Sequence, residues 1–268
     1  MLRTLKSMLR PSVDRLISRF DKRHDNVVPV DYGDGNLFIY ADSEFERAVR
    51  TIPGAKEPDT IKWIETFIKP GETVFDVGAN VGNYSLIIAH HLAQKVSVFA
   101  FEPAWFNFTQ LNRNVALNGF ESCVFPVCAA LSSSDGLNWL YYSTLEYGSS
   151  MHSLDKAVRL KNQPFTPKAR QPVAAFTLDR AVDLLDTVPN HIKIDVDGIE
   201  NEIVKGAATT LANKAVKSVL VELSSDDPED KKTIDILLES GFKIWNVHQK
   251  PRNEFVNFAA HANYIFVR

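Results

Sequence analysis

Strands and helices alternate along most of this chain, and this alternation constrains the fold more than any other feature. Short apolar runs typical of buried strands occupy residues 73–79, 96–103, 123–131, 191–197 and 218–223. Apolar residues at helical spacing predict helices over residues 57–69, 84–92, 106–117, 178–185, 199–211 and 230–239. Strand–helix–strand units of this kind build parallel sheets that carry helices on both faces. We therefore predict an α/β protein with a Rossmann-like, mostly parallel sheet.

The two ends of the chain extend this pattern. Near the C-terminus, apolar runs at 242–247 and 263–268 are expected to pair as antiparallel strands and complete a seven-stranded sheet. Residues 27–50 indicate short strands around a turn at 33–36, which predicts a small β extension. We divide the chain into an N-terminal helix (1–25), the β extension (26–56) and a main domain (57–268). Residues 132–176 are predicted to be irregular, apart from a short hairpin around 138–143.

Composition narrows the functional classes. The formal net charge of −3 gives no overall basic field, so we expect no nucleic-acid partner. Cys123 and Cys128 stand five residues apart in one predicted strand and therefore face opposite sides, which prevents a mutual disulfide. A chain without a disulfide framework is typical of a reducing compartment, and we expect it to be cytoplasmic. No stretch reaches the length of an apolar membrane span, and the basic N-terminus does not resemble a secretory signal.

The N-terminal helix is basic and amphipathic. Residues 1–23 hold seven Lys or Arg against two Asp, and an apolar stripe runs along the predicted helix until Pro11 interrupts it. Something must cover this stripe. We expect packing against the chain's own domain or a second copy in a homodimer. Peripheral contact with an anionic membrane surface is the alternative that we do not favour.

A glycine loop follows the first core strand and opens the next helix. It reads Asp76-Val77-Gly78-Ala79-Asn80-Val81-Gly82-Asn83, with the spacing G-x-x-x-G rather than the G-x-G-x-x-G of dinucleotide binders. Open α/β sheets bind ligands at this edge, and Glu102 ends the second strand where an acid can accept hydrogen bonds from ribose hydroxyls. The residues expected to bind a cofactor are Asp76, Gly78, Asn80, Gly82, Asn83, Glu102 and Ala129.

The motifs DVGANVGNYS, FEP, IKIDVDGIENEIVKGA and VLVEL together resemble the FkbM-type methyltransferases. The resemblance spans about residues 70–247. It implies a Rossmann-like class I methyltransferase fold, S-adenosylmethionine as methyl donor, and transfer to a hydroxyl of a sugar, glycan or small metabolite. Asp197 departs from the family, which usually has Glu at this position.

A second acidic cluster follows the fourth strand. Lys193, Asp195 and Asp197 alternate along it and would share one face, and such charges are tolerable only near the carboxyl end of the strand. Asp195 is the predicted catalytic carboxylate, and Lys193 is expected to form an ion pair with Asp76 or Glu222. A hydroxyl acceptor must lose a proton, and either His248 or His152 could also serve as the base; we predict His248 as a second catalytic residue. Carboxylates such as Glu222 could hold Mg²⁺, but we expect no metal.

Two other functions compete with the methyltransferase. A nicotinamide-dependent oxidoreductase uses a related fold, but the third glycine of its fingerprint is missing here. A catalytically inactive scaffold would keep the fold without the chemistry, but Asp76, Gly78, Glu102 and Asp195 are all present. Both remain alternatives at the level of sequence.

Overall fold

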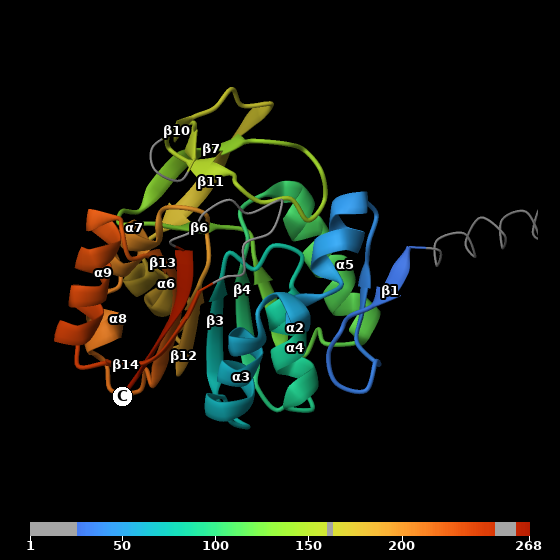
Figure 1. Ribbon diagram of the computed structural model, residues 1–268, viewed down its shortest axis with the longest axis horizontal. Helices are drawn as coiled ribbons and strands as arrows, with labels where there is room; N and C mark the ends of the chain where they lie inside the picture. The colour runs from blue at the N-terminus through green and yellow to red at the C-terminus, as the bar shows by residue number, and fades with distance from the viewer. Residues whose placement is uncertain (1–25, 160–162, 250–260) are drawn as a thin grey trace, which may run out of the picture.

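The computed structural model describes residues 26–159, 163–249 and 261–268, which fold around one central sheet (Figure 1). The seven strands of this sheet have the order β14-β15-β13-β12-β3-β4-β5. Their bounds are β3 (Thr73–Val77), β4 (Ser97–Phe101), β5 (Val124–Val127), β12 (His191–Ile194), β13 (Ser218–Ser224), β14 (Lys243–Gln249) and β15 (His261–Val267). Only β15 runs against the other six, since it pairs antiparallel with both β13 and β14. The predicted mostly parallel, seven-stranded sheet is confirmed.

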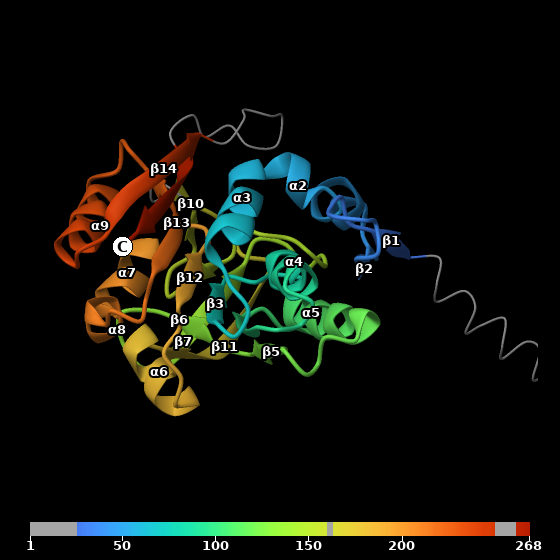
Figure 2. The same cartoon turned by 90° about the horizontal axis from the view of Figure 1, so that it is seen from below.

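Helices cover both faces of the sheet, as Figure 2 shows from below. One face carries α3 (Pro58–Phe67), α4 (Asn83–His91) and α5 (Trp105–Asn118), whose apolar residues share a core with β3 and β4. The other face carries α6 (Leu178–Leu185), α7 (Glu200–Lys205), α8 (Ala208–Ala212) and α9 (Pro228–Glu239) around a second core. Because both faces are covered, the central strands are buried along nearly their whole length.

Some predicted elements are divided or shortened in the structure. The strand predicted over 123–131 is two strands, β5 and β6 (Ala130–Leu131), which belong to different sheets. The helix predicted over 199–211 is two helices, α7 and α8, because the chain breaks at Gly206. A Cβ on Gly206 would lie 2.3 Å from the carbonyl oxygen of Ser132, so this glycine lets two backbones approach. The strand predicted over 191–197 ends at Ile194, and Asp197 adopts a left-handed conformation with φ 64°. The expectation that Asp195 and Asp197 continue the strand was therefore wrong.

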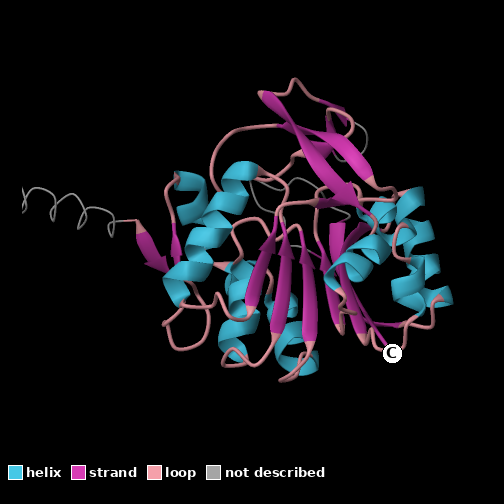
Figure 3. Ribbon diagram, turned by 180° about the vertical axis from the view of Figure 1, so that it is seen from behind, coloured by secondary structure: helices cyan, strands magenta, loops and turns pink. Residues whose placement is uncertain are grey.

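A second sheet stands over the carboxyl ends of the central strands, at the top of Figure 1 and Figure 3. Its order is β6 (Ala130–Leu131), β11 (Ala169–Phe176), β7 (Gly136–Tyr142) and β8 (Ser153–Leu154). Two short strands, β9 (Val158–Arg159) and β10 (Gln163–Pro164), pair beside it. The sequence predicted only a short hairpin here, because Pro172 and polar neighbours mask the alternation of β11, which is buried on one side only.

The predicted β extension packs on the main domain. β1 (Val27–Pro29) pairs with β2 (Phe38–Tyr40), and a short π-helix, η1 (Glu46–Arg50), and α2 (Pro53–Lys56) follow. The amides of Asn114 and Asn118 on α5 accept hydrogen bonds from the backbone of β2 at 2.8 and 3.0 Å. The extension thus contributes to the same core as α4 and α5.

Three predictions concern the chain beyond this architecture. The N-terminal helix, predicted over residues 1–25, lies outside the described residues. Cys123 and Cys128 are both free thiols, as predicted, but they lie just before and just after β5 rather than within one strand. No helix among the described residues is long and apolar enough to cross a membrane.

Candidate active site

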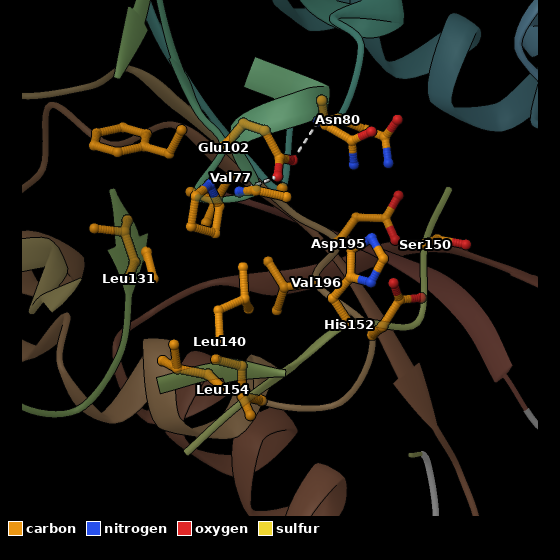
Figure 4. Close-up of a pocket in the computed structure, with 18 of the residues that line it drawn as sticks. Val77, Asn80, Glu102, Leu131, Leu140, Ser150, His152, Leu154, Asp195 and Val196 are labelled. Atoms are coloured by element: carbon orange, nitrogen blue, oxygen red, sulfur yellow. Dashed lines mark hydrogen bonds between the residues drawn. The ribbon is translucent and has the colours of Figure 1, made fainter. Parts of the chain in front are cut away.

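A cavity opens at the carboxyl ends of β3, β4 and β12, below the second sheet (Figure 4). It encloses about 680 Å³ including its open mouth. Leu131, Leu140 and Leu154 form an apolar side of the cavity, while Asp195 and His152 gather at another side. A ligand with a flat apolar part and a polar, reactive part would match these two sides.

Glu102 lies at the end of β4 and is buried in the wall of this cavity. Its two carboxylate oxygens accept hydrogen bonds from the backbone amides of Asn80 and Ala104, each at 2.8 Å. Each oxygen keeps a further acceptor position, so the carboxylate can still receive two hydroxyl groups. Burial raises the pKa of Glu102 to about 7, although the two amides oppose this. The carboxyl group is therefore poised between its ionised and neutral forms at neutral pH.

The glycines of the loop serve the protein's own packing. A Cβ on Gly78 would lie 2.0 Å from the carbonyl oxygen of Asp195, and a Cβ on Gly82 would lie 2.5 Å from Leu111. Both glycines also have positive φ, at 80° and 94°. Gly78 lines the cavity, whereas Gly82 is not among the lining residues and instead lets the start of α4 approach Leu111 of α5.

A buried ion-pair chain connects the loop to the second acidic cluster. The ammonium group of Lys193 lies 3.7 Å from Asp76 and 3.1 Å from Asp195. This confirms the predicted ion pair between Lys193 and Asp76. Asp76 also accepts a hydrogen bond from the hydroxyl of Ser85 at 2.6 Å and is fully buried, so the structure holds it beneath the loop rather than in the described cavity. Asp195 does line the cavity.

The structure separates the two histidines that the sequence offered as bases. His152 lines the cavity, and its Nε2 lies 3.3 Å from the hydroxyl of Ser149. Burial and the nearby Arg50 lower the pKa of His152 to about 4, so its ring is neutral at physiological pH. His248 instead lies on β14, where its Nδ1 pairs with Asp59 of α3. His248 is not among the residues lining the cavity, so the structure does not bring it to the predicted site.

A smaller cavity of about 370 Å³ lies on the other side of the glycine loop. Gly78, Asn80 and Asp195 line both cavities, and Asn83 and Arg50 line only this one. Arg50 comes from the π-helix of the extension and donates two hydrogen bonds to the carbonyl oxygen of Gly148, at 2.8 and 2.5 Å.

The position of Arg50 beside the site was not predicted from the sequence. Arg50 stands in a segment predicted as strands and turns, with no motif around it. Ser149 and Ser150 line the main cavity from a stretch predicted to be irregular. The other expected cofactor residues, Asn80, Glu102 and Ala129, do line the main cavity.

The described residues hold no cluster of three or more His, Cys, Asp or Glu side chains arranged to bind a metal ion. Asp197 of the second acidic cluster accepts a hydrogen bond from the backbone amide of Met151 at 2.6 Å. It thereby fastens the loop before β8 to the end of β12.

Comparison with known proteins decides the family. A model of the methyltransferase FkbM domain matches residues 76–244, more than half of the chain. The chain belongs to the FkbM methyltransferase family. This confirms the predicted family and the methyltransferase class of the domain. The glycine loop, Glu102, Lys193 and Asp195 all fall within the matched residues.

Relatives of this FkbM-family protein act on different acceptors. Hexuronic acid methyltransferase AglP of Haloferax volcanii is 28% identical over 176 residues, 65% of this chain and 65% of AglP. Methyltransferase sdnD of Sordaria araneosa is 32% identical over 194 residues, 64% of this chain and 73% of sdnD. The 31-O-demethyl-FK506 methyltransferase FkbM of Streptomyces tacrolimicus is 25% identical over 198 residues, 66% of this chain and 75% of that protein.

A solved structure supports the fold. Methyltransferase FkbM from Methylobacillus flagellatus KT superposes with a TM-score of 0.50 at 14% identity. The match covers 75% of this chain and 44% of that one. The present chain thus spans less than half of the solved protein and less than two thirds of AglP. The predicted class I methyltransferase fold is confirmed.

Proposed function

We propose that this FkbM-family protein transfers the methyl group of S-adenosylmethionine to a hydroxyl of a sugar, glycan or small metabolite. The observation that carries the proposal is buried Glu102 beside the loop at the end of β3, in a cavity with a wholly apolar side. A ribose needs paired acceptors, and an adenine ring needs an apolar wall. Both requirements meet in this cavity.

Residues on the two sides of the glycine loop would bind the two ends of the donor. Glu102 would accept hydrogen bonds from the ribose hydroxyls, and Ala129 and Leu131 would contact the adenine. Arg50 and Lys193 place positive charge around the smaller cavity, which suits the carboxylate of the methionine part. Asn80, which lines both cavities, would lie between these two ends of the donor.

Asp195 is the proposed base. When bound, the donor supplies an activated methyl group on a sulfonium, which leaves as a neutral thioether. The acceptor hydroxyl becomes strongly acidic as its oxygen gains the methyl carbon, so a carboxylate is basic enough to take the proton. Lys193 holds Asp195 in place at 3.1 Å. The neutral ring of His152 would position the acceptor by accepting a hydrogen bond from a second hydroxyl of the same molecule.

The sugar class of acceptor is proposed because AglP, which is named for methylating hexuronic acid, matches this chain over much of its length. The FK506 methyltransferase shows that other acceptors occur among the relatives.

Two measurements test the proposed function. Calorimetric titration with S-adenosylmethionine and with NADH separates the methyltransferase from the oxidoreductase, and we expect saturable binding of the first ligand only. A methyl-transfer assay over a panel of glycosides and hydroxylated metabolites then separates an enzyme from an inactive scaffold. Binding of NADH in preference to S-adenosylmethionine would reject the proposal.

A further inference from the structure

A large groove adjoins the donor cavity. It encloses about 1520 Å³ including its open mouth and lies between the second sheet and helices α7 and α9. Ser224, the last residue of β13, lies in its wall, so the groove opens at the carboxyl edge where α/β sheets bind ligands. Ser153, Leu154, Asp197 and Ile199 line both the groove and the donor cavity, so the two adjoin at these residues.

Hydroxyl and carboxyl groups dominate the lining of the groove. The hydroxyl-bearing residues include Ser132, Ser133 and Ser224. Seven carboxyl groups face these serines, and Lys156 is the one cationic side chain among the described lining residues. At the rim, Lys205 pairs with Glu202 and Glu229 and offsets part of this charge. The surface is thus rich in hydrogen-bond acceptors and carries a net negative charge.

Two aspartates carry much of this charge next to Ser224. Asp230 accepts a hydrogen bond from the backbone amide of Ser224 at 2.7 Å, and Asp227 caps α9 by accepting one from the amide of Glu229 at 2.8 Å. Burial raises the pKa of Asp230 to about 6, which leaves it mostly ionised at pH 7. Burial raises the pKa of Glu200 to about 8, so that carboxyl group is mostly neutral.

The hydroxyl of Ser224 lacks a partner within the protein. Ser224 is 1% exposed, and its Oγ makes no hydrogen bond in the structure, although its backbone amide does. Native proteins rarely leave a buried hydroxyl unsatisfied, because such a group loses its hydrogen bonds to water without replacement. Rotation of this side chain toward the groove that Ser224 lines would let a polar ligand supply the missing partner.

We propose that this groove is the acceptor site and that it selects a hydroxyl-rich sugar without a carboxylate, either neutral or amine-bearing. Sugar hydroxyls are donors that match the carboxylates and serines of the wall. A uronic acid would instead bring its own negative charge against Asp227 and Asp230, and like charges at close range disfavour binding. This inference rests on the proposed methyl transfer, and it sets the chain apart from AglP, which is named for a hexuronic acid.

The test measures sugar binding directly, without turnover. The full-length protein is first saturated with S-adenosylhomocysteine, the demethylated donor, and then titrated with methyl glucoside, methyl glucosaminide and methyl glucuronide. We expect the glucoside and the glucosaminide to bind at least tenfold more tightly than the glucuronide. If S-adenosylhomocysteine itself does not bind, the proposed donor function fails before any sugar is added, so the two failures are distinguishable.

Matched variants show whether the groove causes this selectivity. Asp227→Asn and Asp230→Asn together remove two charges, and each asparagine can still accept the backbone hydrogen bond of the aspartate that it replaces. We expect the ratio of glucoside affinity to glucuronide affinity to be at least threefold smaller in this double variant than in the wild-type protein. Asp226→Asn is the control, since Asp226 is exposed, adjacent in sequence and not among the lining residues.

Ser224→Ala removes the unpartnered hydroxyl, and we expect glucoside affinity to fall severalfold while the melting temperature is kept. Ser225→Ala, which changes an exposed neighbour, should leave affinity unchanged. Absence of sugar binding to the donor-loaded protein, or equal or tighter binding of the glucuronide, would overturn the proposal. Glucoside affinity unchanged by Ser224→Ala would also overturn it.

Discussion

At the scale of single residues, Glu102 makes donor binding sensitive to pH. Because burial raises its pKa to about 7, the carboxylate that accepts ribose hydroxyls is fully available only above that pH. We expect the affinity for S-adenosylmethionine to fall about tenfold between pH 8 and pH 6, as the ionised fraction drops by that factor. Calorimetric titration across this range measures the effect.

The control for this prediction is Glu102→Gln, which keeps the shape of the side chain and removes its titration. Its donor affinity should be lower by about 1–3 kcal/mol, the cost of imperfect hydrogen bonding to a buried group, and should not vary with pH. If the donor affinity of the wild-type protein did not change between pH 6 and pH 8, Glu102 would not be the residue that binds the ribose.

Asp195 gives the second prediction at this scale. Asp195→Asn nearly preserves shape and removes the charge that takes the proton, so we expect turnover to fall by about 10²-fold or more while donor binding survives. Initial rates and donor titration of the same preparation measure the two effects. His152→Asn should also slow turnover, whereas His248→Asn should not. If the Asp195→Asn variant kept the wild-type rate of turnover, the role of Asp195 would be structural only.

The residues of the site were predictable from sequence only where a motif fixed them to a strand end. Glu102 and Asp195 follow buried strands, so the parallel sheet brings them together at one edge. His152 and His248 both looked like isolated loop histidines, and nothing local distinguishes them. The second sheet carries His152 into the cavity, whereas His248 contacts Asp59 of α3, away from the cavity. These are contacts between segments far apart in sequence, which periodicity does not reveal.

At the scale of elements, the glycine loop fixes the distance between β3 and β12. Gly78→Ala would force a Cβ to within 2.0 Å of a backbone oxygen at a positive φ, so both strand ends would have to move. We expect a loss of more than about 3 kcal/mol in stability, since core overpacking adds to the left-handed strain, together with loss of donor binding. Denaturant unfolding and titration measure the two effects.

Gly71→Ala is the matched control for this substitution. Gly71 has a similar φ of 87°, but a Cβ there would meet nothing within 4 Å. Its substitution should therefore cost only about 1–2 kcal/mol of backbone strain and leave donor binding intact. If Gly78→Ala and Gly71→Ala lost equal stability and equal donor affinity, the close contact with Asp195 would not be the reason that position 78 requires glycine.

Helices and strands were predictable from sequence wherever the spacing of apolar residues clearly matched one of the two types of element. Helices α4, α5 and α6 begin and end within a residue of their predicted bounds, because their apolar spacing and stop signals agree. The second sheet was missed since β11 is half exposed and contains Pro172, so its alternation is weak. The broken helix at Gly206 depends on a contact with Ser132, a residue more than 70 positions away.

At the scale of the whole molecule, residues 1–25 lie outside the described part of the chain, and the expectation for them rests on sequence alone. Deleting them should lower the melting temperature or dissociate an oligomer without abolishing donor binding, because their apolar stripe is expected to pack on protein. Light scattering of both forms and co-sedimentation with anionic liposomes measure the alternatives. If the shortened protein kept its oligomeric state and melting temperature but no longer bound liposomes, residues 1–25 would instead be a membrane anchor.

The place where the second sheet joins the chain has a consequence for engineering. The sheet arises from one continuous insertion between β5 and α6, and its first strand, β6, pairs in parallel with its last, β11, through Ala130 with Ala175 and Leu131 with Phe176. The insertion therefore leaves and rejoins the domain at adjacent points. A segment from another family member could be grafted between these points without re-registering the seven central strands. Such a graft would exchange the part of the site that this sheet carries, including Leu140, His152 and Leu154. Glu102, Asp195 and the carboxylates of α9 would stay in place.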